Sequence, residues 1–139
     1  MRILVIEDNK LKAQDIRKSL EKQYPNVVIE ESYAYASGVR KAYKEKYDAV
    51  IIGNSLPYYE SEPHDIQPDM ARIILDEFYD LEISPKSIIC SAFEPGEKEE
   101  YFANIVSQFD FCLGYVRYDC TSSNWENELT SLINKNIIV

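Results

Sequence analysis

Residues 3–9 read Ile-Leu-Val-Ile-Glu-Asp-Asn, an apolar run that ends abruptly in two acids and an amide. A nearly continuous apolar run of this length is typical of a parallel strand that helices cover on both faces. Similar runs occupy residues 49–52 and 87–90, and weaker ones occupy residues 27–29 and 111–116. The chain therefore contains five candidate strands, of which the second, being more polar, suits an edge of the sheet.

Between these runs, apolar residues recur at helical spacing. A further helix is predicted over residues 37–46, although Gly38 lowers the helix propensity there. Ser123 and Glu126 have the S-x-x-E spacing of a capping box, which predicts the start of the last helix. The apolar stripes comprise Ala13, Ile16 and Leu20; Ala71, Ile74 and Phe78; Phe102, Ile105, Val106 and Phe109; and Trp125, Leu129, Leu132 and Ile133.

Strand and helix alternate five times, which predicts an α/β fold with a parallel sheet, right-handed crossovers and helices on both faces. We expect a single domain over residues 1–139, with an apolar tail at residues 136–139. Residues 57–69 contain three prolines and four acids, which predicts a long loop. In such a sheet, ligands bind beyond the carboxyl ends of the strands, so the candidate site lies just after each strand.

The composition disfavours several classes of function. With 15 Lys and Arg against 24 Asp and Glu, the net charge is −9, which argues against binding nucleic acid through its phosphates. No apolar run reaches the roughly 20 residues that span a bilayer. Acids follow the first apolar run too early for a signal peptide, so we expect a cytoplasmic protein without a membrane partner. Cys90, Cys112 and Cys120 form no CxxC pair, so neither a disulfide framework nor a zinc site is indicated.

Glu7 and Asp8 are the first candidate binding residues. Adjacent acids at a strand end repel each other unless a cation or a basic group lies close. One interpretation is a magnesium site, because Mg²⁺ binds one or two carboxylates and keeps several waters. The other is a solvated loop in which Asp8 or Asn9 caps the first helix. In either case the carboxylates would repel a phosphate held by backbone N–H groups.

Three segments together resemble the receiver domain of two-component response regulators. They are residues 3–9; residues 47–52, Tyr-Asp-Ala-Val-Ile-Ile, which lead to Leu56-Pro57; and residues 88–92, Ile-Ile-Cys-Ser-Ala. The resemblance extends from Arg2 to about Lys135. It implies a flavodoxin-like, doubly wound (βα)5 fold with strand order 2-1-3-4-5. It also implies an acidic pocket that takes Mg²⁺ and a phosphoryl group on an aspartate.

The chain departs from the receiver pattern at two positions. Receivers carry the phosphoacceptor aspartate four residues before the proline of the Leu-Pro pair, and here that position is Gly53, followed by Asn54. Receivers also carry a lysine at the end of the fifth strand, where this chain has Gly114 or Tyr115. Arg117 is then expected to be the only cation nearby.

These departures predict that the acyl-phosphate chemistry is absent. Without a third carboxylate, Glu7 and Asp8 should bind Mg²⁺ weakly if at all. Ser91 matches the switch hydroxyl of receivers, which binds the phosphoryl group. Without that group, Ser91 is expected to be an ordinary strand-end serine bonded to backbone.

Tyrosines suggest where a partner would bind. In receivers, the face formed by the fourth helix, fifth strand and fifth helix is the usual docking or dimerisation surface. Tyrosine suits interfaces because it buries a large area and keeps its hydroxyl in water, although each of these residues could equally flank the core. The candidate interaction residues are Tyr101, Tyr115, Arg117 and Tyr118 near that face, and Tyr58 and Tyr59 at the start of the long loop.

The sequence thus favours a receiver-like signalling and protein-interaction module that is independent of phosphorylation, has no catalytic activity and requires no cofactor. Its partner would be another protein or a second copy of the chain. A first alternative is a working response regulator that takes the phosphoryl group on Asp8 or Glu7 with Mg²⁺. A second is a small-molecule-binding protein on the same fold, which the lack of a glycine-rich phosphate loop disfavours.

Overall fold

The computed structural model describes residues 1–138 and has a five-stranded parallel sheet at its centre. The order of the strands across the sheet is β2-β1-β3-β6-β7, so the predicted order 2-1-3-4-5 is confirmed, with β6 and β7 as its fourth and fifth strands. The strands are β1 (Arg2–Ile6), β2 (Val28–Ser32), β3 (Ala49–Ile52), β6 (Ser87–Ser91) and β7 (Cys112–Arg117).

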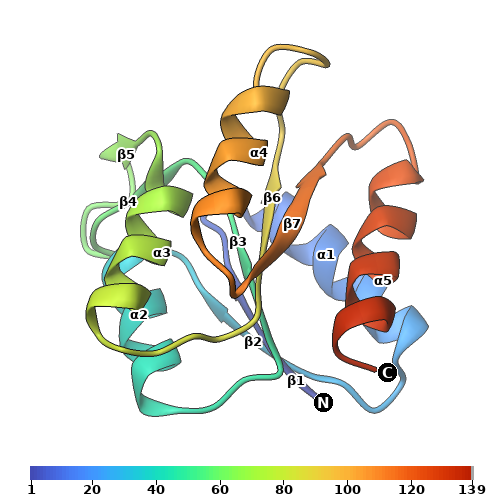
Figure 1. The fold of residues 1–139 in the computed structure, drawn as a ribbon, viewed down its shortest axis with the longest axis horizontal. Helices are drawn as coiled ribbons and strands as arrows, with labels where there is room; N and C mark the ends of the chain where they lie inside the picture. Colours follow the sequence, from blue (N-terminus) through green and yellow to red (C-terminus); the bar gives the residue numbers. More distant parts are fainter. Residues whose placement is uncertain (139) are drawn as a thin grey trace.

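Five helices cover both faces of this sheet (Figure 1). One face packs against α1 and α5, and the other packs against α2, α3 and α4. The predicted α/β architecture is therefore confirmed. The helices are α1 (Lys10–Gln23), α2 (Tyr35–Lys44), α3 (Met70–Asp80), α4 (Glu99–Gln108) and α5 (Asn124–Asn136).

Two apolar layers explain why the central strands read as continuous apolar runs. Successive side chains of a strand point to opposite faces of the sheet. In β1, Leu4 and Ile6 enter the layer under α2, α3 and α4, while Ile3 and Val5 enter the layer under α1 and α5. All four are at most 1% exposed. A strand that is covered on both faces is therefore apolar at most of its positions.

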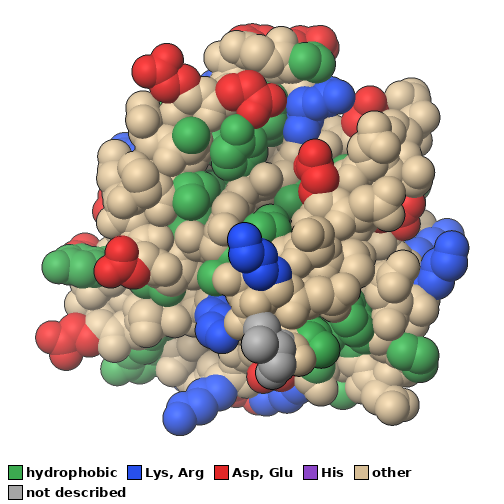
Figure 2. Space-filling view, turned by 45° about the vertical axis from the view of Figure 1, so that its right-hand side comes forward, with side chains coloured by type: hydrophobic (Ala, Val, Ile, Leu, Met, Phe, Trp, Pro, Cys, Tyr) green, Lys and Arg blue, Asp and Glu red, His purple; other side chains and the backbone are tan. Residues whose placement is uncertain are grey.

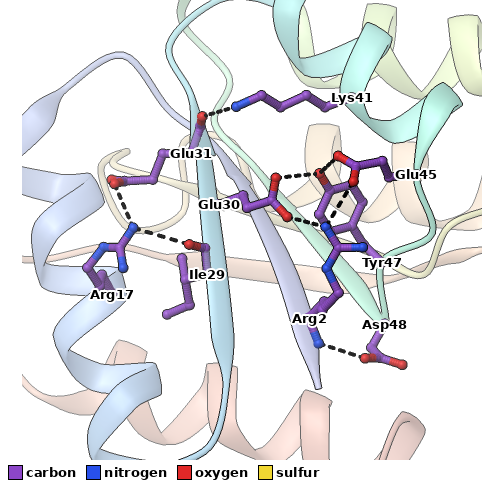
Figure 3. Close-up of polar contacts among 9 residues, drawn as sticks. All are labelled: Arg2, Arg17, Ile29, Glu30, Glu31, Lys41, Glu45, Tyr47 and Asp48. Carbon is purple, nitrogen blue, oxygen red and sulfur yellow. Dashed lines mark hydrogen bonds and ion pairs between the residues drawn. The ribbon is translucent and has the colours of Figure 1, made fainter.

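The edge strand β2 carries acidic side chains, and these form ion pairs, which Figure 3 shows. Arg2 binds Glu30, and Arg17 lies 2.9 Å from a carboxylate oxygen of Glu31. Lys41 of α2 donates a hydrogen bond of 2.7 Å to the backbone carbonyl of Glu31. Charged side chains along an edge strand hinder pairing with another chain. The prediction that this run forms an edge is confirmed.

The segment 57–69 is more regular than predicted. It is not a loop throughout, because β4 (Leu56–Pro57) and β5 (Ile66–Gln67) pair as a short antiparallel ladder. This hairpin, residues 56–67, lies beside the carboxyl edge of the large sheet, at the left of Figure 1. Proline tolerates this position because the ladder is only two residue pairs long and lies outside the main sheet.

Two predicted helix ends differ in detail. Helix α2 begins at Tyr35, two residues before the predicted start. Ser123 is the N-cap of α5, as the sequence predicts, but its side chain makes no capping bond. The hydroxyl of Ser122 accepts a hydrogen bond of 3.1 Å from the Asn124 amide instead, so the capping-box prediction is wrong in its bonding. Of the predicted apolar tail, Asn136 ends α5, and residue 139 lies outside the described residues.

Gly38 is required by a close approach of α2 to β1. A Cβ atom at this position would lie 2.7 Å from Cδ1 and 2.8 Å from Cγ2 of Ile6, which real Cβ atoms do not do. The same glycine that lowers the helix propensity of this segment therefore permits the helix to pack against the sheet.

We predict that Gly38→Ala lowers the free energy of unfolding by about 1–2 kcal/mol, although alanine is the better helix former, because overpacking outweighs the propensity gain. Urea unfolding monitored by circular dichroism measures the change. Arg40→Ala, on the exposed side of the same helix, is the control and should change stability by less than about 0.5 kcal/mol. A Gly38→Ala protein as stable as the parent would contradict the packing argument.

Candidate functional site

A cleft of about 220 Å³ opens at the carboxyl edge of the sheet, between the ends of β1, β3 and β6. The structure brings together the predicted residues Glu7, Asp8, Asn54 and Ser91 along its walls. Lys12, which the sequence analysis did not single out, lines the same cleft. The cleft lies where parallel α/β sheets generally bind ligands.

Glu7 and Lys12 form a buried ion pair inside the cleft. The ammonium of Lys12 lies 2.7 Å from Oε1 of Glu7, and the two side chains are only 9% and 5% exposed. Lys12 also donates a hydrogen bond of 2.6 Å to the backbone carbonyl of Cys90, at the end of β6. The ammonium therefore links β1, α1 and β6 through two short contacts.

The start of α1 fixes both partners of this pair. The side chain of Asn9 caps the helix by accepting a hydrogen bond of 3.0 Å from the Lys12 amide. The backbone N–H of Asn9 in turn donates a hydrogen bond of 3.0 Å to Oε2 of Glu7. Of the two predicted cap residues, Asn9 is the cap, and it holds Glu7 and Lys12 in place across the first helical turn.

Gly53 lies directly beneath the Glu7 carboxylate. A Cβ atom at position 53 would overlap Oε1 of Glu7 and lie 3.1 Å from its Cδ. The backbone is held there as well, because the Gly53 amide donates a hydrogen bond of 2.8 Å to the Ile6 carbonyl. A side chain at position 53 and the Glu7–Lys12 pair are therefore mutually exclusive in this arrangement.

Asp8 is the second acid of the cleft and has an unusual protonation equilibrium. Its partial burial raises the pKa, and the nearby Glu7 carboxylate raises it further, to about 6. The Lys12 ammonium offsets part of this rise. Because Lys12 lies against Glu7, Asp8 carries the uncompensated negative charge of the cleft.

Asn54 and Ser91 also line the cleft. Asn54 is engaged with α3: its Oδ1 accepts a hydrogen bond of 3.3 Å from the Ala71 amide, and its backbone carbonyl accepts one from Met70. Ser91 is nearly buried at the end of β6, and its carbonyl accepts a hydrogen bond of 2.9 Å from the Tyr118 amide. Asn54 thus serves to start a helix at the cleft wall.

The structure corrects the prediction that Arg117 is the only nearby cation. In the register of β6 and β7, Arg117 lies opposite Ser91. Its guanidinium, however, contacts the Phe93 carbonyl at 3.4 Å and the Asp119 carboxylate at 3.8 Å. Lys12 is the cation that reaches the acids. Sequence reasoning could have found it, since Lys12 stands four residues before the buried Ile16 and so shares its side of the helix.

The candidate interaction residues separate into bound and exposed groups. The Tyr101 hydroxyl donates to Asp69 at 2.5 Å, and the Tyr115 hydroxyl donates to Glu99 at 2.5 Å. Tyr118 is only 9% exposed and packs in the layer under α1 and α5, so it belongs to the core and the prediction of a surface role is wrong for it. Tyr58 and Tyr59 in the hairpin are 39% and 56% exposed.

The two buried cysteines are not suited to redox chemistry. Burial raises the pKa of both Cys90 and Cys112 to about 11, whereas reactive thiols have lowered pKa values. Cys90 lies in the layer under α1 and α5, and Cys112 lies in the layer on the other face of the sheet. Core packing therefore accounts for both residues.

Comparison with known proteins gives one clear result. No protein-family model matches the chain, and no curated protein sequence matches it. Among solved structures, the receiver domain of the Francisella response regulator 1452 matches with a TM-score of 0.73 and 18% identity, over 99% of this chain and 96% of that one. This chain has the receiver fold.

Two further solved structures are similar to this chain. The response regulator TrrA from Thermotoga maritima, in complex with Mg²⁺ and BeF, matches with a TM-score of 0.66 and 16% identity over 94% of this chain and 97% of that one. A streptococcal protein from a family of redox sensors that evolved from response regulators matches with a TM-score of 0.67 and 16% identity. That match covers 96% of this chain and 51% of the other.

The residues of the cleft do not fit the Mg²⁺ that the receiver fold implies. Mg²⁺ needs close to octahedral coordination by oxygen atoms. Oε1 of Glu7, which lines the cleft, and the nearby Cys90 carbonyl oxygen already contact the Lys12 ammonium. Within residues 1–138, no cluster of three or more His, Cys, Asp or Glu side chains is placed to hold a metal ion.

We predict that Lys12→Met lowers the free energy of unfolding by about 3 kcal/mol, because it leaves the Glu7 carboxylate buried without a counter-charge. Glu7→Gln combined with Lys12→Met should recover a large part of this loss, since neither buried charge remains. A double-mutant cycle by urea unfolding measures the coupling. Additive effects of the two single substitutions would contradict a direct ion pair.

A second prediction concerns pH. Because the folded-state pKa of Asp8 is about 6 against 3.8 for the free group, the folded state holds the proton more tightly. The contribution of Asp8 to stability is therefore fully present below pH 4 and is lost as the pH rises through 6.

Asp8→Asn removes this titration. We expect the variant to be more stable than the parent at pH 7.5 by about 1 kcal/mol, a figure reduced for the partial solvent exposure of the carboxyl. The advantage should shrink toward zero by pH 4. Unfolding in urea at pH 4.5, 6 and 7.5 measures it, with Asp110→Asn on an exposed loop as the control. An advantage that is independent of pH would overturn the assignment.

Proposed function

We propose that this chain is a receiver-like protein-interaction module of two-component-type signalling that works without aspartyl phosphorylation and has no catalytic activity. One observation carries the proposal: the Glu7 carboxylate, paired with Lys12, occupies the space above Gly53 that a phosphoacceptor side chain would need. The position has no acceptor group, and a side chain there would require the Glu7 carboxylate to move away.

The chemistry of phosphoryl transfer supports this conclusion. Transfer to a receiver needs an acceptor carboxylate, a bound cation that neutralises the incoming charge, and free access to both. Here the carboxylate of Glu7 and the ammonium of Lys12 neutralise each other and are both nearly buried. Breaking this pair to admit a phosphoryl group would leave two nearly buried charges without their partners, which is costly.

The hairpin supports a role in binding. Tyr58 packs edge-on against Tyr35 with ring centroids 6.0 Å apart, and Tyr59 follows it at 6.4 Å. Ile66 is 43% exposed on the paired strand. Exposed tyrosines on a fixed backbone are typical of the residues that dominate protein interfaces. We therefore propose the hairpin as a partner-binding surface, with another protein or a second copy of this chain as the partner.

The face formed by α4, β7 and α5 remains the second proposed surface, and it suits homodimerisation. On the side of the molecule in Figure 2, where α5 is turned toward the viewer, much of the surface is uncharged. Exposed positions of α5 include Asn127, Ser131 and Asn134. Tyr115 and Arg117 lie on β7 and are half-buried.

The proposal also concerns location and class of partner. We propose a cytoplasmic location, and the net charge of −9 supports a protein that does not bind nucleic acid. Among the helices of residues 1–138, none has the length and apolar character to cross a membrane.

Intact mass spectrometry after incubation with acetyl phosphate and Mg²⁺ tests the proposal. We expect no phosphoryl adduct on this chain under conditions that phosphorylate a functional receiver, which is the positive control. A stoichiometric adduct that is lost in Asp8→Asn would overturn the proposal and identify a response regulator with a relocated acceptor. An adduct that survives Asp8→Asn and is lost in Glu7→Gln would assign the acceptor to Glu7.

A further inference from the structure

We propose that the Lys12 ammonium is the resident cation of the cleft and excludes divalent metal ions from it, so that removing its charge turns the cleft into a divalent-cation site. This inference deepens the proposed function and rests on the same cleft. It concerns binding alone and involves no chemical step.

The contacts of the ammonium place it among oxygen atoms that metal ions use. Oε1 of Glu7 lies at 2.7 Å and the Cys90 carbonyl oxygen at 2.6 Å. Carboxylate and carbonyl oxygens are the ligands of Mg²⁺ and related hard cations. On a further side, the ammonium lies 5.7 Å from the centre of the Tyr118 ring, whose face also favours a cation.

The position of Lys12 is rigidly determined. Its backbone amide is bonded to the Asn9 side chain, and its side chain is 9% exposed. The ammonium cannot move into solvent without leaving the Glu7 carboxylate buried and unpaired. A metal ion that enters the cleft would therefore have to displace a held cation or remain close to it, and the like charges would repel each other.

The charged side chains of the cleft predict that removal of the Lys12 charge strengthens the binding of divalent cations. Two acids, Glu7 and Asp8, line the cleft, and Lys12 is the one basic side chain that lines it with them. A neutral side chain at position 12 leaves both acids without a basic neighbour in a cleft of about 220 Å³, and it frees the Cys90 carbonyl oxygen that the ammonium contacts. Two carboxylates, a carbonyl and several waters make a set of ligands that a small divalent cation accepts.

Mn²⁺ is the probe for the experiment, because electron paramagnetic resonance counts the free ion directly. We expect Lys12→Met to bind one Mn²⁺ at least tenfold more tightly than the parent. The matched control is Lys10→Met, which removes an exposed lysine from the same helical turn and should bind no better than the parent. Adding Glu7→Gln to Lys12→Met should abolish the gain.

Thermal unfolding supplies a second readout, because an ion that binds only the folded state raises its stability. Mg²⁺ should raise the melting temperature of Lys12→Met and leave that of the parent and of Lys10→Met unchanged. A folded Lys12→Met protein that gains no affinity for Mn²⁺ would overturn the inference. Binding of Mn²⁺ to the parent as tight as to Lys12→Met would overturn it too.

A measurement on the parent protein alone keeps the inference testable if Lys12→Met does not fold. Acetylation by a water-soluble active ester, read out by peptide mass spectrometry, reports whether each amine is free. Lys12 should react far more slowly than Lys10, with or without 10-fold molar excess of Mg²⁺. Mg²⁺-dependent reaction of Lys12 would mean that the metal displaces the ammonium.

The experiments separate a failure of the resident-cation inference from a failure of the proposed function. A phosphoryl adduct on the parent with unchanged Lys12 protection would overturn the proposed function and leave the resident cation in place. Metal binding to the parent without any adduct would overturn the resident cation and leave the absence of an acceptor intact.

Discussion

The Glu7–Lys12 pair is the constraint on which the carboxyl edge of this protein depends. A buried ion pair is not by itself a source of stability, since removing two charges from water costs about as much as their attraction returns. The pair instead fixes how the residues at this edge of the sheet are arranged. Glu7 fixes what can stand at position 53, Lys12 ties α1 to the end of β6, and Asn9 keeps the two partners in register.

Much of the fold could be predicted from the sequence because the central strands have no solvent-facing side. Continuous apolar runs such as residues 49–52 are hard to place anywhere except in a sheet that is covered twice. The edge position of β2 was equally predictable, since Glu30 and Glu31 could not be buried without partners. The pairing of β4 with β5 was not, because a ladder of two residue pairs leaves almost no periodic signal.

The site was predictable only in part, for a physical reason. The carboxyl ends of parallel strands lie at the same edge of the sheet, so the topology predicts that the residues after these ends lie close together. These residues are Glu7, Asp8, Asn54 and Ser91. The role of Lys12 was not predicted, because a lysine in the first turn of a helix is ordinarily solvated; its spacing from Ile16 was the one signal that placed it on the buried side of α1. From the sequence, Gly53 indicates only that the acceptor is missing. The structure adds that the Glu7 carboxylate occupies the space where a side chain at position 53 would begin.

A receiver that responds to phosphorylation must keep its cation free to change partners, because the resemblance assigns that cation first to the acceptor aspartate and then to the phosphoryl group. In this chain the cation is on α1 and has a permanent partner. A fixed pair has one state, so it cannot report the arrival of a charged group. Under the proposed function, a signal would enter through surfaces that partners reach, such as the hairpin of Tyr58 and Tyr59. Under the same proposal, the buried pair would contribute by tying α1 to the end of β6 beside that hairpin.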